Sequence, residues 1–519
     1  MEVLETGDEI GKSVIYQYLS AIVSVLSGFL FYIYIVRVFT TEVVGVVALL
    51  SAMMTLFSTI FSIGLNFGVQ HFISYYIGKN DPESLRTVVK EISIVLIIVS
   101  ILAIAFTWFS SPVFAYLFFH TYRYIDIIRI MGFAVVANLG ASVTGGMVLG
   151  LQKFRVNALI NIAYTVVMYS AIVILLQFIV SPLVVVVGWT AGYSLGALLF
   201  SIHVTRRMRG MKSSAKAVSV RTIIDYSLPL FISSLLGFGA TYVDRFVVSF
   251  FLNLSEMGIY NFSLLIVTAL SMLIGPFGTI LLPKLSELYG RGDIENLRLH
   301  SSKAIELLLA FYVPVSLIVA AISPSILLFL ANPSYLPGFI PITVITIVNA
   351  LFISSNILAV SLQAVRKTRI FLLSSSLALI SNFIVSILLI PRFGINGAAI
   401  GFSSTYVLGF AVTYYYSRKY ETAYFEKGKI AKIMLSGAVM FSVVFALQMY
   451  YWYSPLKMIA YILLGFAIYV LLIRLLGTFS GEDVEMFMKI ASKGFEYQSN
   501  TEEACSEVTS FSDSVLNFV

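Results

Sequence analysis

The chain is poor in the residue types that build metal sites and redox centres. It has one cysteine, Cys505, and four histidines in 519 residues, and the histidines are widely spaced. A single cysteine cannot close an intrachain disulfide, and histidines without ligand spacing do not predict a metal centre. No acids or nucleophile spaced for catalysis are visible either. We therefore expect no metal, no cofactor and no enzymatic activity.

Charge is scarce as well. Charged residues make up 11% of the chain and hydrophobic residues 59%, whereas about a quarter of an average soluble protein is charged. The net charge of +7 could indicate a nucleic-acid partner, but Lys and Arg are dispersed between apolar runs. Basic loops between such runs report membrane topology. We expect membrane lipids around the chain and no nucleic acid.

Long apolar runs dominate the sequence. They are continuous rather than alternating, which predicts helices and not a barrel. With the N-terminus inside, most of the 33 Lys and Arg fall on inner segments, as cytoplasmic loops require. We predict an all-α, multi-pass protein of the cell membrane with both termini cytoplasmic. The fourteen predicted spans are 13–37, 43–66, 88–110, 125–150, 156–179, 182–205, 223–250, 258–282, 304–322, 340–363, 370–390, 396–417, 430–450 and 456–475.

An internal repeat organises these spans. Residues 78–86 and 290–298 both read G-[KR]-x-D-x-E-x-L-R and begin 212 residues apart. Chance similarity between basic loops is the alternative, and a nearly fixed offset at several positions argues against it. Further matches at nearly the same offset are Ser111-Pro112 with Ser323-Pro324, and Leu151-Gln152 with Leu362-Gln363.

The repeat predicts two pseudo-symmetric six-helix lobes, residues 13–207 and 223–417. Six is even, so both copies enter the membrane from the same side, and such parallel repeats are related by an axis along the membrane normal. A basic cytoplasmic linker, 208–222, joins the lobes. Two extra helices, 430–475, and a polar cytoplasmic tail, 476–519, follow the second lobe.

Short motifs then give a family resemblance. They are Tyr226-Ser-Leu-Pro229, Asp244-Arg245, Gly258-Ile-Tyr260, Leu282-Pro-Lys-Leu-Ser286, Pro391-Arg-Phe-Gly-Ile-Asn-Gly-Ala-Ala399 and Phe479-Ser-Gly-Glu-Asp483. In this order the chain resembles the polysaccharide transporter (oligosaccharide flippase) branch of the multidrug/oligosaccharidyl-lipid/polysaccharide exporter superfamily. The resemblance implies a flippase that moves lipid-pyrophosphate-linked oligosaccharides to the outer leaflet by alternating access. Its partners could include glycan-assembly enzymes.

Charged residues inside spans are the first candidates for a substrate cavity, because they usually face a cavity or a partner. Basic side chains there could hold a pyrophosphate. For Asp244 and Arg245, in the outer half of span 7, the alternative is a local pair with Arg245 reaching the interface. Interface anchoring is the favoured role of the charges at the outer helix ends. The candidates are Arg245, Asp244, Arg37, Arg129, Asp126 and Asn382.

Amides within spans form a second set, whose default role is hydrogen bonding between helices. We expect some of them to line the cavity; they are Asn138, Gln152, Asn349, Asn356, Gln363 and Asn382. The pairs Gly64-x-x-x-Gly68 and Gly192-x-x-x-Gly196 predict close helix contacts. Pro229 predicts a bend in span 7.

Two other functions are compatible with a polytopic chain. A multidrug or cation-coupled exporter of the same superfamily is the nearer one, although such exporters generally have twelve spans and many carry an acid in an early helix. Span 1 has no acid, which argues against coupling through that helix. A membrane-embedded glycan polymerase or ligase is disfavoured, because the outer loops are short and the spans repeat.

Overall fold

The computed structural model describes residues 7–209, 219–451 and 455–478, and within these ranges every regular element is a helix. Fourteen spans are long and apolar enough to cross a membrane, which confirms the predicted number. Large apolar side chains are exposed on the outside of the bundle, among them Phe109 and Phe178 at 81% and 79%. Lipid must cover such a surface. The predicted tail and most of the predicted linker lie outside the described residues.

The first half of the chain runs up and down through seven long helices and one short one. Several are longer than the predicted spans. They are α1 (Gly7–Val38), α2 (Thr41–Ser62), α3 (Leu65–Gly78), α4 (Pro82–Phe119), η1 (Tyr122–Tyr124), α5 (Ile125–Gly150), α6 (Phe154–Leu176) and α7 (Pro182–Met208).

The second half repeats this order with more breaks. Its elements are α8 (Val220–Phe251), α9 (Leu254–Ser271), η2 (Met272–Ile274), α10 (Gly275–Gly290), α11 (Ile294–Ala321), α12 (Ser323–Leu330), η3 (Pro333–Gly338), α13 (Phe339–Phe352), α14 (Ser355–Ala364), α15 (Arg369–Phe393) and α16 (Ile395–Lys419). The appended pair is α17 (Lys427–Tyr451) and α18 (Pro455–Leu475).

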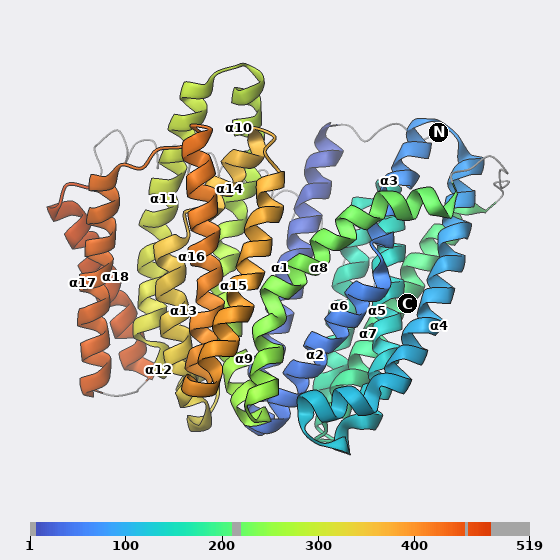
Figure 1. Cartoon of the computed structure of the whole chain (residues 1–519), viewed down its shortest axis with the longest axis horizontal. Coiled ribbons are helices and arrows are strands. Elements are labelled where there is room, and N and C mark those ends of the chain that lie inside the picture. The colour runs from blue at the N-terminus through green and yellow to red at the C-terminus, as the bar shows by residue number, and fades with distance from the viewer. Residues whose placement is uncertain (1–6, 210–218, 452–454, 479–519) are drawn as a thin grey trace, which may run out of the picture.

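Figure 1 shows two groups of helices, α2 to α7 and α9 to α18, which converge near α2 and α9 and separate towards the other end. The separated end carries the repeated segments after α3 and α10, and we call it the loop face. We call the converging end the contact face. Helix α8 crosses between the groups and packs on α2, α3 and α4 as well as on α15. Pro229 lies inside α8, between the part that packs on α3 and the part that packs on α15.

The repeated segment builds the same turn twice. Asp81 caps α4 by accepting a hydrogen bond from the backbone N–H of Ser84, and Asp293 caps α11 in the same way from Asn296. The residue before each aspartate has left-handed backbone geometry, with φ of 51° at Asn80 and 73° in the second copy. One local sequence pattern therefore specifies one turn in both lobes.

The offset between the lobes changes further along the chain, which corrects one predicted match. Gln152 and Arg366 both have positive φ, 58° and 63°, and both follow a helix that ends with the same backbone hydrogen bonds. Gln152 therefore corresponds to Arg366, at an offset of 214, and not to Gln363. The two Leu-Gln pairs are identical in sequence but lie at different positions relative to the helix end.

Two glycines bring the lobes together at the contact face. A methyl group on Gly45 of α2 would overlap the carbonyl oxygen of Leu254, and one on Gly258 of α9 would overlap that of Thr41. The contact is reciprocal, because Thr41 to Leu254 and Gly45 to Gly258 are both 213 residues apart. Such self-complementary contacts are the mark of a two-fold axis. The pseudo-two-fold axis therefore passes between α2 and α9.

Polar contacts surround this glycine crossing. The Oγ1 atom of Thr41 lies 2.6 Å from Oγ of Ser255. Arg37, at the end of α1, donates hydrogen bonds to the carbonyl oxygens of Phe329 (2.7 Å) and Leu330 (3.0 Å) at the end of α12. The contact face is thus closed by backbone approach and by hydrogen bonds between the lobes.

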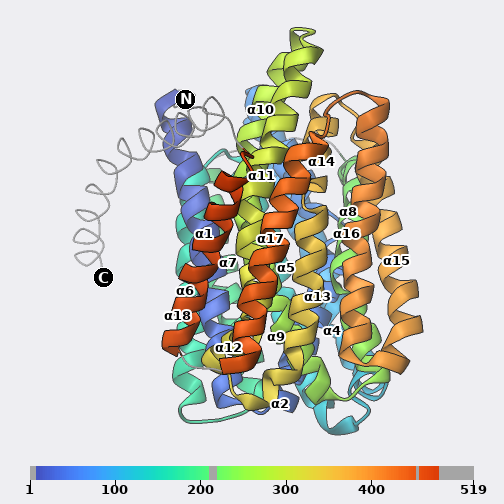
Figure 2. The same ribbon diagram turned by 90° about the vertical axis from the view of Figure 1, so that its left-hand side faces the viewer.

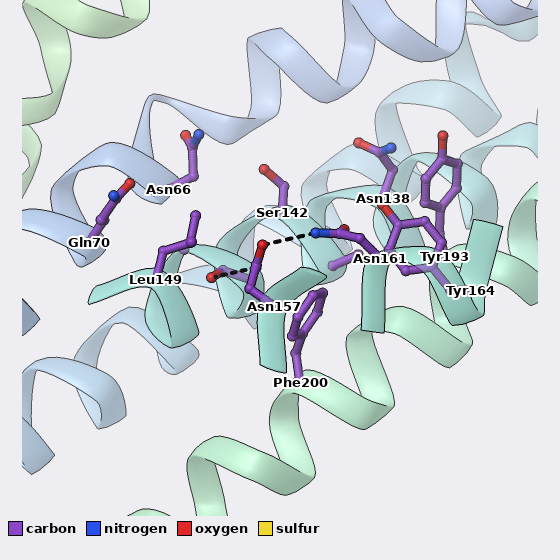
Figure 3. Close-up of a pocket in the computed structure, with 13 residues that line it drawn as sticks. Asn66, Gln70, Asn138, Ser142, Leu149, Asn157, Asn161, Tyr164, Tyr193 and Phe200 are labelled. Carbon is purple, nitrogen blue, oxygen red and sulfur yellow. Dashed lines mark hydrogen bonds between the residues drawn. The ribbon is translucent and has the colours of Figure 1, made fainter. Parts of the chain in front are cut away.

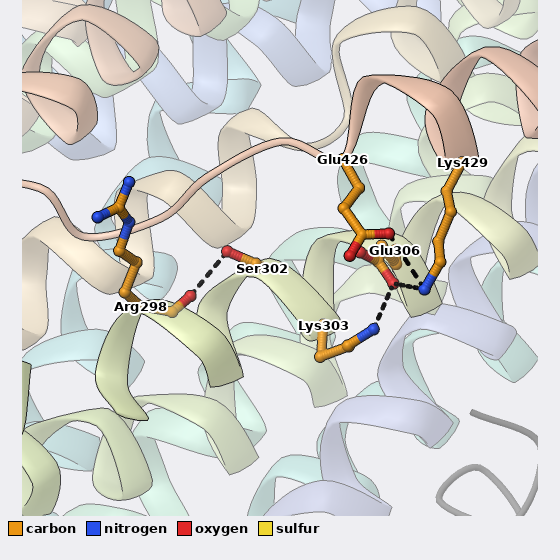
Figure 4. Close-up of polar contacts among 6 residues, drawn as sticks. All are labelled: Arg298, Ser302, Lys303, Glu306, Glu426 and Lys429. Carbon is orange, nitrogen blue, oxygen red and sulfur yellow. Dashed lines mark hydrogen bonds and ion pairs between the residues drawn. The ribbon is translucent and has the colours of Figure 1, made fainter. Parts of the chain in front are cut away.

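The appended helices α17 and α18 pack on α11 and α12 of the second lobe (Figure 2). At the loop face the carboxylate of Glu306, on α11, is 2% exposed and accepts from Nζ of Lys303 (3.2 Å) and of Lys429 (3.5 Å) on α17 (Figure 4). Nearer the contact face, Ser325 donates to the side chain of Gln448. Both ends of α17 are therefore fastened to the second lobe.

Candidate functional site

A polar cavity of about 340 Å³ lies within the first lobe, between α3, α5, α6 and α7. Its volume is in the range of small-molecule sites. Amide, hydroxyl and aromatic side chains point into it (Figure 3). The lining residues are Asn66, Gln70, Asn138, Ala141, Ser142, Gly145, Gly146, Leu149, Asn157, Asn161, Tyr164, Tyr193 and Phe200.

A second cavity of about 230 Å³ adjoins the first. The two share Asn66, Asn138, Ser142 and Tyr193 in their linings, so they form one polar region. The second cavity extends along α2 past hydroxyl side chains and reaches Ser234 of α8. Its further polar lining residues are Thr55, Ser58, Thr59, Ser62 and Ser234.

The backbone of α2 and α3 positions two of the amides. Ile63 and Gly64 have positive φ, 46° and 70°, and this break separates the two helices. Helix α3 packs closely on α5 at Gly146 and Gly150. A methyl group at these two positions would lie 2.8 Å and 2.9 Å from carbonyl oxygens of α3. Asn66 therefore stands at the start of α3, directly over the cavity.

Some of the amides are fixed by one another. Asn161 donates from Nδ2 to Oδ1 of Asn157 (2.9 Å), and Asn157 donates to the carbonyl oxygen of Gly145 (3.4 Å). Gln17 of α1 also donates to Oδ1 of Asn157 (3.2 Å). Asn157 therefore connects α6 to α1 and to α5 through hydrogen bonds. Asn66 and Gln70 project into the cavity from the opposite wall (Figure 3).

The structure brings three of the predicted candidates together in the second lobe, and none of them lines the two cavities. Arg245 is 8% exposed; it donates from Nε to Oδ1 of Asn261 (3.1 Å) and to the carbonyl oxygen of Thr241 (2.6 Å). Asp244 is fully buried and accepts a hydrogen bond from the hydroxyl of Tyr260. Their contacts join α8 to α9.

Asn382 belongs to the same part of the second lobe. Its Nδ2 donates to the carbonyl oxygen of Ala240 (3.5 Å), one turn before Asp244, and its Oδ1 accepts from Ser386 (3.0 Å). The contact joins α15 to α8. One oxygen of Asp244, Oδ1, has no hydrogen-bond partner.

The other three candidates lie at helix ends near the contact face. Asp126 and Arg129 form an ion pair at 3.2 Å, and the Arg129 guanidinium lies 4.8 Å from the centroid of the Trp108 ring. Trp108 is 46% exposed, a position that suits a membrane interface. Arg37 holds the end of α12, as described above. Asp126 and Arg129 thus lie where interface anchoring is expected, whereas Arg37 contacts the other lobe; the anchoring role stays a prediction.

Of the cavity amides, only Asn138 was among the predicted set. The other cavity amides lie at or near the ends of predicted spans, where a single amide is compatible with an ordinary contact between helices. The missed signal is spacing: Asn66 with Gln70, and Asn157 with Asn161, are each four residues apart, which places both members on one face of a helix. Among the described residues, no group of three or more His, Cys, Asp and Glu side chains could hold a metal ion.

Comparison with known proteins identifies the family. Residues 10–289 match the model of the family described as "Polysaccharide biosynthesis protein". The chain belongs to this family. A curated relative, the uncharacterized membrane protein MJ1068 of Methanocaldococcus jannaschii, is 23% identical over 361 residues, which cover 65% of this chain and 70% of the relative.

Solved structures share the fold of this family member. The lipid II flippase MurJ, in an inward closed conformation, aligns with a TM-score of 0.70 at 16% identity, over 88% of this chain and 98% of MurJ. An inward-facing multidrug resistance MATE family transporter aligns with a TM-score of 0.64 at 13% identity, over 79% and 95%. At these identities the matches show that the chain shares the fold of these two transporters.

Proposed function

We propose that this transporter is a flippase that moves lipid-linked oligosaccharide precursors from the cytoplasmic to the outer leaflet by alternating access. The observation that carries the proposal is a polar cavity inside one lobe, together with a contact face closed by the reciprocal glycine crossing. A membrane transporter must offer a polar head group such a shelter on one side at a time. Flipping breaks no bond, so the residues need only bind, shield and release.

In this proposal the chain lies in the plasma membrane, and its loop face is on the cytoplasmic side. Lys79 and Arg86 in the first copy of the repeat, and Arg291 and Arg298 in the second, lie at or near this face, as basic residues do on cytoplasmic sides. Residues 13–207 and 223–417 would then be the two moving lobes. With the contact face closed, the structure would then be a state that is closed towards the outside.

Within this function, the second-lobe residues keep that lobe in shape rather than hold cargo. Arg245 donates a hydrogen bond to Asn261, and Asp244 accepts one from Tyr260. Asn382 donates to a backbone carbonyl of α8. Arg37 then acts at the contact face, where its hydrogen bonds must break when that face opens. Asp126 and Arg129 anchor the interface.

A multidrug exporter is the second candidate, because a multidrug MATE transporter has the same fold. Its cargo would be a lipophilic cation, which needs a counter-charge or an acid at the site. No Asp or Glu lines the two cavities of the first lobe. The lining therefore favours the oligosaccharide precursor.

Deletion of the gene in its own host tests the function. We expect lipid-linked oligosaccharide to accumulate on the inner leaflet while surface glycan decreases, with both restored by the wild-type gene. Unchanged glycans, combined with greater sensitivity to cationic drugs, would show that the chain is an exporter instead. The readout is the amount of lipid-linked oligosaccharide, measured beside total surface glycan.

A further inference from the structure

We propose that the first-lobe cavity is a subsite for uncharged sugar rings, and that the anionic phosphate of the lipid carrier remains outside it. This inference rests on the proposed function and narrows it. It assigns the amides of α3, α5 and α6 to the sugar.

The lining has the chemistry of a carbohydrate site. Five amides and one serine line the first cavity. Two tyrosines are its only titratable lining residues, and a tyrosine is neutral near pH 7, so the lining carries no charge. Each amide presents a donor pair and an acceptor close together. Neighbouring hydroxyl groups on a sugar, and an N-acetyl group, present the same two functions.

Aromatic rings complete the lining. Tyr164 and Tyr193 lie with their ring centroids 5.8 Å apart at 49°, and Phe200 lies on the same wall. The C–H faces of a pyranose ring are apolar and pack on such rings, while its hydroxyl edge meets the amides. A phosphate group has no such face.

The second lobe serves as an internal control for the amides. At the offset of 212, Asn66 and Gln70 correspond to Gly278 and Leu282; at the offset of 214, Asn157 corresponds to Phe371. The second lobe therefore forms the corresponding helices, with more breaks, without these three amides. Folding of the six-helix unit does not require them, so their presence in one lobe needs a separate explanation.

The position of these amides in a cavity between helices favours a role in binding. Amides inside spans are expected to hydrogen-bond to another helix, and Asn157 with Asn161 does so in part. Asn66 and Gln70 instead face open space (Figure 3). Amides that line a cavity at the end of a span are placed to bind a polar cargo.

Basic residues lie beyond the cavity on the side of the loop face. Lys153 is the N-cap residue of α6, one turn before Asn157, and Arg206 lies in the last turn of α7, beyond Phe200. An anionic phosphate would be attracted to that level. The sugar then enters the lobe while the phosphate remains near the headgroups.

Binding to the purified full-length protein tests the inference. Isothermal titration calorimetry would compare three probes: the neutral disaccharide N,N′-diacetylchitobiose, inorganic pyrophosphate and tetraphenylphosphonium. We expect saturable binding of the disaccharide that weakens at least about tenfold in the double variant Asn66→Leu/Asn138→Leu, which removes two hydrogen-bonding side chains. Gln177→Leu, an exposed amide at the end of α6, is the matched control and leaves binding unchanged.

The other outcomes separate the two proposals. Pyrophosphate binding that the double variant weakens, without disaccharide binding, overturns the sugar subsite but leaves the flippase intact if the deletion strain still accumulates lipid-linked oligosaccharide. Tetraphenylphosphonium binding in the cavity, with unchanged glycans in the deletion strain, overturns both. If the double variant fails to fold, Gln70→Leu, on the half-buried face of α3, replaces it in the same comparison.

Discussion

Two glycines control how closely the lobes approach. Gly45→Ala adds a methyl group where α9 leaves no room, and overpacking of this kind costs about 1–3 kcal/mol. The strain exists only while the contact face is closed, so the variant shifts the population by roughly tenfold towards opening of that face. The alkylation rate of a cysteine at Ser255 would report the shift. Gly78→Ala, which meets nothing within 4 Å, should leave the rate unchanged.

Two aspartates make the loop face sensitive to acid. Hydrogen bonds from Ser84 and Asn296 lower the pKa of Asp81 and Asp293 respectively. Because the folded-state pKa lies below the unfolded value of about 3.9, this stabilisation is complete above that value and is lost as the pH falls through the folded-state pKa.

We therefore expect the thermal midpoint in detergent to decrease as the pH falls below about 4 through these two sites. The double variant Asp81→Asn/Asp293→Asn keeps both helix caps, since asparagine caps as well as aspartate, but cannot titrate. Its midpoint should fall less over the same range. An identical pH profile for the two proteins would contradict the assignment.

At the scale of elements, the long helices could be predicted and their breaks could not. Hydropathy runs of about 20 residues located the fourteen spans, because lipid imposes that length. The break at Ile63 and Gly64 depends on a left-handed turn that the packing of α3 against α5 and α8 favours. A single isoleucine in that conformation leaves no signal in a hydropathy profile.

The candidate site shows the same limit. Charges were selected because they are rare in spans, and Arg245 and Asp244 are indeed buried, but their neighbours Asn261 and Tyr260 occupy them. Which face of a helix meets a cavity depends on packing between distant elements. The spacing of Asn66 and Gln70 predicts that both lie on one face of α3. It does not predict that α5, α6 and α7 leave a cavity opposite that face.

The attachment of α17 to α11 depends on one buried carboxylate. Glu306→Gln removes the charge that two lysines share, and we expect a loss of about 1–3 kcal/mol, the usual effect of losing hydrogen bonds to a buried charged group. Hydrogen exchange should increase in the first turns of α17. Glu287→Gln is the control, because Glu287 pairs with Lys284 at an exposed site where such pairs contribute about 0–1 kcal/mol. Equal losses in the two variants would contradict the special role of Glu306.

At the scale of the whole molecule, the proposed alternating access requires the contact face to open. The hydroxyl oxygens of Thr41 and Ser255 are 2.6 Å apart, so Thr41→Cys/Ser255→Cys can form a disulfide without large movement. In a Cys505→Ser background, we expect oxidation to abolish transport and dithiothreitol to restore it. Each single cysteine variant should be insensitive to the oxidant. Full transport by the cross-linked protein would show that this face stays closed throughout the cycle.

The reciprocal contact of Gly45 with Gly258 has the geometry of a homodimer interface, yet it lies within one chain. Two identical subunits would have to place the same cavity on both sides of their axis. Covalent linkage removes that constraint, because each half can change its sequence alone. The chain keeps the two-fold contact of a dimer, while one half holds the amides and the other packs on α17 and α18. If the two halves move as proposed, the shared axis would guide that motion, and the residues that differ between the halves would decide which cargo binds.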